Sequence, residues 1–202
     1  MLVFIIMRGR LSAAPMVYGT VADVAGFWPI HYHPLAGRSY REEVLEGLRQ
    51  KLENQSSNTV VVVGHSQGSV LRAWLVANEQ VPEQNRDCME ETALEGESVL
   101  PPAESLYLLT CGSPLKSLYR GFFPAYFHDQ FFLRGNNRVG AWCNGWRQTD
   151  PVATQTPISG VQEVEIPDED PADVRGHSYY WNEEALTVWV QGRLAPGEGS
   201  AS

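Results

Sequence analysis

The clearest pattern in the chain is a run of four valines followed by apolar residues at helical spacing. Val60–Val63 are consecutive β-branched residues, which is typical of a strand that is buried on both faces. After Gly68 the apolar residues recur at the spacing of an α-helix: Val70, Leu71, Trp74, Leu75 and Ala77. The pattern predicts a fully buried strand, a tight turn and a helix in direct succession.

Helical patterns also occur before the valine run and near the end of the chain. Ser39-Tyr40-Arg41-Glu42 has the sequence of a capping box, and apolar residues follow it on one helical face up to Leu52. Near the other end, Asn182 is expected to cap a last helix that runs through Trp189. A helix on each side of the valine strand implies a parallel sheet with crossover connections.

Other segments read as strands. We expect strands or extended segments at residues 2–7, 17–27, 106–111 and 139–146. Residues 161–166 alternate apolar and acidic side chains, so this segment predicts an edge strand with Glu163 and Glu165 facing solvent. The fold class expected is α/β, with a mostly parallel sheet and flanking helices.

The length of 202 residues suits a single domain over residues 1–202. Within it, residues 1–16 are expected to be a truncated first strand and loop, and residues 195–202 a flexible tail. The apolar opening is compatible with a longer protein whose upstream strands are missing.

The most aromatic stretch, residues 119–132, permits two interpretations. It could form a lid or an apolar wall for an acyl chain, with substrate-binding side chains at Phe122, Phe123 and Phe127. It could equally be a helical segment whose aromatic side chains pack into the core against the sheet.

Composition narrows the class of partner. A net charge of −9 argues against a nucleic-acid partner, and 43% apolar residues indicate a globular protein. No stretch has the apolar length of a membrane span. The three scattered cysteines favour a reducing, cytoplasmic compartment and have no metal-ligand spacing, so neither a metal nor another cofactor is expected. Oligomeric state stays open.

The turn after the valines has the sequence Gly64-His65-Ser66-Gln67-Gly68. A serine on a sharp strand-to-helix turn needs flanking glycines, because a Cβ there would collide with neighbouring backbone. Such a turn presents the hydroxyl at the top of the sheet, next to a helix N-terminus. We therefore predict Ser66 as a nucleophile and the backbone N–H of Gln67 as an oxyanion donor.

A serine nucleophile needs a base beside it and an acid to orient that base. In enzymes with this kind of turn the acid follows the serine and the histidine comes last. Of five histidines only His177 follows every predicted strand, and Asp150 leaves an extended run at a strand-to-loop exit. The predicted triad is Ser66, Asp150 and His177. Rival acids lie in a charged loop before the histidine: Asp168, Glu169, Asp170 and Asp173.

These motifs, with the strand exit Gly112-Ser113-Pro114, resemble the lipase- and esterase-like serine hydrolases of the α/β-hydrolase superfamily. The resemblance spans about residues 17–192 and implies acyl transfer through an acyl-enzyme on a small-molecule substrate. It also implies a lid-like segment after the strand that ends at Gly112. The chain departs from the family by lacking a His-Gly pair upstream of Ser66 for a second oxyanion donor. Gly9, in Arg8-Gly9-Arg10, is the candidate.

Two classes of function follow from the sequence. The first is a hydrolase that cleaves a carboxylic ester of a lipid-like or apolar acyl substrate; a thioesterase or acyltransferase would use the same residues. The second is a hydrolase-fold module with weak or no catalysis that associates with a membrane surface or a partner. The absent oxyanion signature motivates it, together with the upstream region that a longer protein would carry.

Overall fold

The computed structural model describes residue 28 and residues 32–33, 37–38, 41–55, 58–78, 100–168 and 174–195. The chain divides into two compact units, residues 1–44 and 45–202. In the first unit, β1 (Tyr32–His33) pairs antiparallel with β2 (Gly37–Arg38). The helix α3 (Arg41–Glu53) begins within this unit, where the capping box predicts a helix. The strands expected at 2–7 and 17–27 lie outside the described residues, and the expected single domain stays a prediction.

The second unit is built on a four-stranded, all-parallel sheet. Its order is β3 (Val60–His65), β4 (Leu106–Cys111), β5 (Ala141–Trp146) and β6 (Gln162–Glu165). The register runs from Val60 opposite Leu106 to His65 opposite Cys111, so β3 and β4 end side by side. The predicted α/β class with a parallel sheet is confirmed, and among the strands that the structure describes β6 lies at the edge, as predicted.

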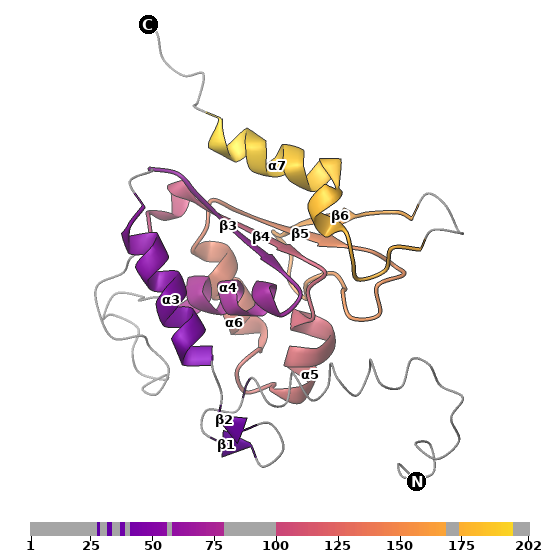
Figure 1. Ribbon diagram of the computed structural model, residues 1–202, viewed down its shortest axis with the longest axis horizontal. Coiled ribbons are helices and arrows are strands. Elements are labelled where there is room, and N and C mark those ends of the chain that lie inside the picture. Colours follow the sequence, from indigo (N-terminus) through magenta and orange to yellow (C-terminus); the bar gives the residue numbers. More distant parts are fainter. Residues whose placement is uncertain are drawn as a thin grey trace, which may run out of the picture. The chain divides into compact units, whose positions relative to one another are not determined.

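Helices cover both faces of this sheet. Figure 1 shows α4 (Gln67–Asn78) and α6 (Asp129–Asn137) on one side and α7 (Glu184–Leu194) on the other. The side chains of β4 point alternately to the two faces of the sheet, because successive side chains of a strand point in opposite directions. Leu109 and Cys111 pack with Leu186 and Trp189 of α7. Short elements complete the unit: η2 (Ala103–Ser105), η3 (Leu115–Tyr119), α5 (Arg120–Phe122) and η4 (Tyr180–Asn182).

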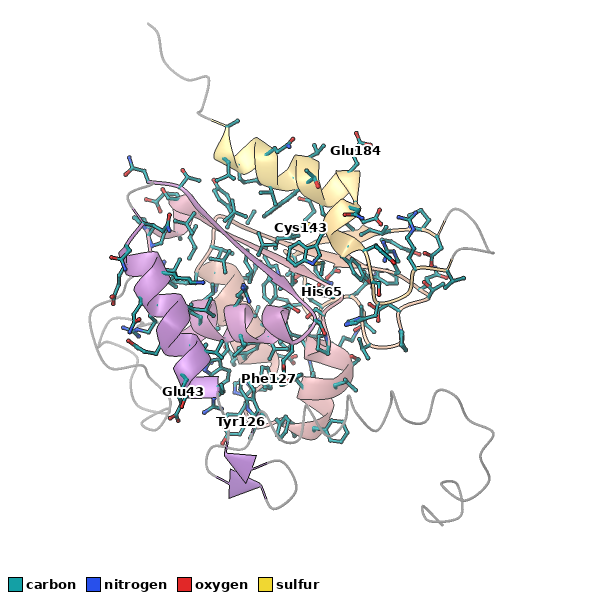
Figure 2. The ribbon with its side chains drawn as sticks, viewed as in Figure 1. Glu43, His65, Tyr126, Phe127, Cys143 and Glu184 are labelled. Carbon is teal, nitrogen blue, oxygen red and sulfur yellow. The ribbon has the colours of Figure 1, made fainter. Side chains whose placement is uncertain are left out.

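On the α4 side the sheet packs against an aromatic cluster. Its six members are all buried: Trp74, Tyr119, Phe127, Phe131, Phe132 and Trp142. Ring centroids of Phe127 and Phe131 are 4.9 Å apart, and Phe132 stacks on Trp142 of β5 at 6.3 Å. Figure 2 shows Phe127 beside α4. Most of the aromatic stretch therefore forms core, as the second interpretation predicts.

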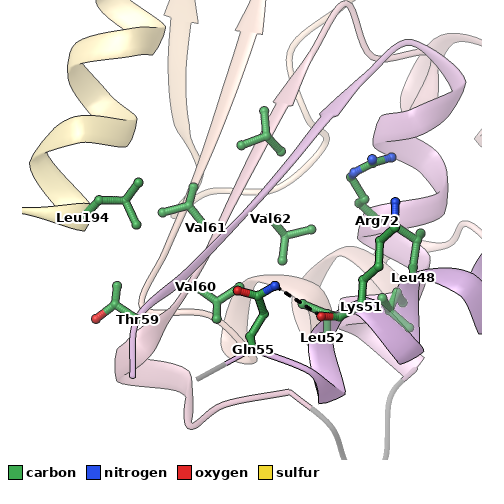
Figure 3. Close-up of a pocket in the computed structure, with 12 residues that line it drawn as sticks. Leu48, Lys51, Leu52, Gln55, Thr59, Val60, Val61, Val62, Arg72 and Leu194 are labelled. Carbon is green, nitrogen blue, oxygen red and sulfur yellow. Dashed lines mark hydrogen bonds between the residues drawn. The ribbon is translucent and has the colours of Figure 1, made fainter. Parts of the chain in front are cut away.

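The prediction of a fully buried valine strand is wrong. Only Val62 of the four valines is buried, and the others are half-buried. Among the described residues β3 is an edge strand of the sheet. Beside it lies a hollow of about 420 Å³, lined by the valines and by Leu48 and Leu52 of α3 (Figure 3).

Two further expectations differ from the structure. Asn182 does not cap the last helix, because it closes the short η4 turn with a hydrogen bond to the Tyr179 carbonyl; α7 begins at Glu184 and continues to Leu194. Glu163 does not face solvent freely, since its carboxylate accepts hydrogen bonds from Asn144 and Thr156. Cys111 and Cys143 are free and buried, and burial raises the pKa of each thiol to about 12.

Candidate active site

Three side chains from distant parts of the chain meet at the carboxyl ends of the parallel strands. Ser66 directly follows β3, Asp150 lies in the connection after β5, and His177 lies between β6 and α7. All strands of a parallel sheet end at the same edge, so the loops that follow them converge there. Figure 2 shows His65, the residue before Ser66, at this end of β3.

Ser66 has the backbone conformation of a sharp turn. Its φ of 54° is in the left-handed region, which residues other than glycine rarely adopt. The Ser66 amide donates to the Cys111 carbonyl at 3.0 Å, and the Ser69 amide donates to the Ser66 carbonyl at 2.9 Å. These bonds tie the turn both to the neighbouring strand and to the first turn of α4.

The two glycines of the motif have different roles. A Cβ at Gly64 would lie 2.6 Å from the Ser69 Cα and 2.7 Å from the Gly68 carbonyl oxygen, which no real Cβ tolerates. At Gly68 the nearest atom is Nη1 of the flexible Arg72 side chain, 3.1 Å away. The predicted backbone collision is therefore confirmed for Gly64 and wrong for Gly68.

His177 joins the other two side chains through its two ring nitrogens. Its Nε2 lies 2.8 Å from Ser66 Oγ, and its Nδ1 lies 2.9 Å from Asp150 Oδ2. This is the hydrogen-bond geometry that the sequence analysis expects for the three residues. With Nδ1–H donating to the carboxylate, Nε2 is free to accept the proton of the serine hydroxyl.

Asp150 is held by four hydrogen bonds. Oδ1 accepts from the amides of Val152 and Ala153 at 3.0 and 3.2 Å. Oδ2 accepts from the Tyr180 hydroxyl at 2.8 Å as well as from His177. Burial opposes ionisation of Asp150, but the hydrogen bonds from His177, Val152 and Tyr180 outweigh it and hold the pKa of its carboxyl below the usual value. The side chain is thus a fixed carboxylate.

A second histidine lies against the first. The His65 ring is 4.8 Å from the His177 ring, and its Nε2 lies 2.9 Å from the His177 carbonyl oxygen. Because a carbonyl oxygen only accepts, His65 Nε2 carries the donated proton. Burial lowers the pKa of His65 and keeps this ring neutral near pH 7. His65 therefore holds the backbone of His177 through a hydrogen bond to its carbonyl oxygen.

The remaining predicted residues divide into three groups. Gln67 is the first residue of α4, next to Ser66, where its backbone N–H belongs to a helix N-terminus. Phe127 cannot contact a substrate, because it is 0% exposed within the aromatic cluster, so this prediction is wrong. Phe122 is 54% exposed and Phe123 half-buried, and their substrate-binding roles stay predictions. Gly9 lies outside the described residues.

Of the four rival acids, the structure describes Asp168, and Asp150 is the residue whose carboxylate bonds to His177. Asp168 accepts hydrogen bonds from the Thr149 hydroxyl and the Arg175 amide. The other three rivals, Glu169, Asp170 and Asp173, lie outside the described residues.

Sequence reasoning missed two residues of the site. Tyr180 donates to Asp150, and Arg147 binds the backbone on both sides of His177. Tyr180 stands in the run Gly176-His177-Ser178-Tyr179-Tyr180-Trp181, but nothing in this run tells which tyrosine points inward. Arg147 follows an extended segment as a single cation, a pattern that normally marks an exposed strand end.

The chain was compared with protein-family models, curated proteins and solved structures. None of the three comparisons found a match.

Two further observations concern metal ions and membranes. Within the described ranges, no group of three or more histidine, cysteine, aspartate or glutamate side chains could hold a metal ion. Among the helices that the structure describes, none combines the length and the apolar character needed to cross a bilayer. The hollow beside β3 lies apart from the triad, because neither Ser66, Asp150 nor His177 lines it.

Proposed function

We propose that the protein is a serine hydrolase of the α/β-hydrolase type that cleaves a carboxylic ester of a lipid-like or apolar acyl substrate. The observation that carries the proposal is the continuous hydrogen-bonded chain from Ser66 Oγ through the His177 ring to Asp150. A serine on a strained strand-to-helix turn, with a base and a buried carboxylate behind it, is the arrangement that nucleophilic acyl transfer requires.

The proposed reaction uses each of these atoms. Ser66 Oγ attacks the ester carbonyl carbon while its proton passes to His177 Nε2, and Asp150 stabilises the imidazolium that forms. The backbone N–H of Gln67, at the N-terminus of α4, faces the developing oxyanion. The alcohol leaves with the proton from Nε2. Water then attacks the acyl-enzyme with His177 again as base, which releases the acid and restores the Ser66 hydroxyl.

An apolar substrate is supported by large exposed side chains near His177. Tyr179 and Trp181 are 60% and 58% exposed, and both lie within four residues of His177. The Trp181 ring stands edge-on to the His65 ring with 6.0 Å between centroids. Exposed aromatic groups beside a nucleophile favour an acyl chain over a strongly polar one.

A fluorophosphonate probe tests the nucleophile, because it forms a covalent bond only with an activated serine. We expect the wild-type protein to be labelled and Ser66→Ala to lose all labelling. Ser105→Ala is the matched control, since Ser105 is half-exposed at the opposite end of β4 and should leave labelling intact. Labelling of Ser66→Ala at the wild-type level would refute the assignment.

Turnover of p-nitrophenyl esters then separates an esterase from a non-catalytic module. The proposal predicts Ser66-dependent hydrolysis that becomes more efficient with longer acyl chains. If a well-folded protein hydrolyses no short or long ester, the alternative of a binding module is favoured, and liposome binding should then be measured.

A further inference from the structure

Arg147 is the first residue after β5, and its side chain is fully buried. Its Nη1 donates to the carbonyl of Gly176 at 3.2 Å and to the carbonyl of Ser178 at 2.5 Å. These two carbonyls belong to the residues immediately before and after His177. One guanidinium group therefore forms hydrogen bonds to the backbone on both sides of the histidine.

The guanidinium is itself fixed from several directions. Its Nη2 forms an ion pair with Glu183, and its Nε lies 4.0 Å from the Asp168 carboxylate. Its carbon stacks over the Tyr180 ring at 4.5 Å. A buried arginine with carboxylate partners and a stacked aromatic ring has little freedom to move, because its planar fork of donors fits one arrangement.

The position of Arg147 in the chain connects these hydrogen bonds to the triad residues. Arg147 and Asp150 belong to the same connection between β5 and β6. Asp150 binds the His177 ring, while Arg147 binds the carbonyls of the neighbouring residues Gly176 and Ser178. Tyr180 links the two, because it stacks under Arg147 and donates to Asp150. The connection that carries the acid thus also sets the position of the base.

We propose that Arg147 is a positioning residue that holds the His177 loop so that Nε2 stays within hydrogen-bond distance of Ser66. The expected effect on the reaction rate rests on the proposed function. The expected effect on the position of the His177 ring rests only on the hydrogen bonds described above. A displacement of the base by about 1 Å is enough to slow a reaction on the order of a hundredfold.

The test compares Arg147→Lys and Arg147→Met with Arg175→Met. A lysine keeps the charge beside Glu183, but its single nitrogen cannot hold both carbonyls and the carboxylate in the same geometry. Arg175 is the matched control, because its guanidinium binds the same Glu183 oxygen at 2.9 Å, whereas the carbonyls of Gly176 and Ser178 are bound by Arg147. Circular dichroism and a cooperative thermal transition establish that each variant is folded.

Two readouts follow. In fluorophosphonate labelling, we expect the maximal rate to fall about tenfold to a hundredfold in Arg147→Lys and further in Arg147→Met, with half-saturation unchanged. In proton NMR, the wild type should show a far-downfield resonance from the His177 Nδ1 proton shared with Asp150. This resonance should be lost or broadened in both Arg147 variants and kept in Arg175→Met.

The outcomes separate the two proposals. A folded Arg147→Lys that labels at the wild-type rate and keeps the resonance overturns the positioning role and leaves the hydrolase function standing. If Arg147→Met fails to fold, Arg147→Lys decides; if neither folds, Arg147 serves the stability of the fold and the positioning role is refuted. If the wild type is not labelled, the proposed function fails, while the resonance still tests the positioning role.

Discussion

The site network and the aromatic cluster hold the second unit together in opposite ways. The site network, made of Ser66, His177, Asp150, Tyr180 and Arg147, joins its segments by hydrogen bonds, and Arg147 is anchored by an ion pair with Glu183. The aromatic cluster joins α4, α6 and β5 mainly by ring contacts.

The two kinds of contact differ in how strongly they depend on direction. A hydrogen bond weakens steeply when its angle changes, so the network fixes positions to a fraction of an ångström. Ring contacts depend mainly on buried area and tolerate small shifts, so the cluster supplies free energy of folding. We therefore expect substitutions in the network to change the reaction more than stability, and substitutions in the cluster to do the reverse.

The strongest test of this contrast is Asp150→Asn. The amide cannot hold His177 in the tautomer that leaves Nε2 free, so the rate of ester hydrolysis should fall on the order of 10⁴-fold. Initial rates with a p-nitrophenyl ester measure the loss, and a thermal melt should still show one cooperative transition. A fall of less than tenfold in a folded variant would show that Asp150 does not orient the base.

In the cluster, Phe127→Ala should cost about 3–5 kcal/mol of unfolding free energy, because it opens a cavity in a fully buried site. Urea denaturation measures this loss, and the labelling rate per folded molecule should stay at the wild-type value. Phe122→Ala is the control: Phe122 is exposed, and its removal should change stability by less than about 0.5 kcal/mol. A large change in the labelling rate of folded Phe127→Ala would break the contrast.

The smallest effect concerns His65 and acid pH. Burial lowers its pKa below 6.5, so the folded protein keeps this ring neutral while the unfolded chain binds a proton as pH falls through 6.5. The stability from the neutral ring is complete above pH 6.5 and is lost as pH falls through the lower folded pKa. His65→Gln should flatten this part of the pH dependence by a few tenths of a kcal/mol. Urea midpoints of the wild type and of the variant, measured above and below pH 6.5, give the change of stability with pH. If His65 were not involved, this change would be the same in both proteins.

Much of the sheet and of the triad could be predicted from local pattern. The bounds of β4 coincide with the predicted segment, and Ser66, Asp150 and His177 follow from their order after successive strands. Burial was harder to predict, because it depends on neighbours that are distant in sequence. The four valines predict a strand, but its edge position is a property of the whole sheet.

Phe127 and Arg147 show the same limit from two sides. An aromatic residue in the most aromatic stretch of the chain is compatible with a core or with a substrate wall, and only the packing of Trp74 and Phe131 around Phe127 decides. A single arginine after a strand predicts exposure, and only the carbonyls and the carboxylate that surround Arg147 explain its burial. In both cases the deciding partners are contributed by other segments.

The distance along the chain between Ser66 and His177 has a consequence for biosynthesis. The two residues are 111 positions apart, yet their side chains share a hydrogen bond. At about 5–20 residues per second, a ribosome adds His177 roughly 6–22 s after Ser66. During that interval the nascent chain carries Ser66 without the histidine that the proposed function assigns as its base. Under that proposal, reactivity toward a fluorophosphonate would report that the chain has been made at least as far as His177 and has folded.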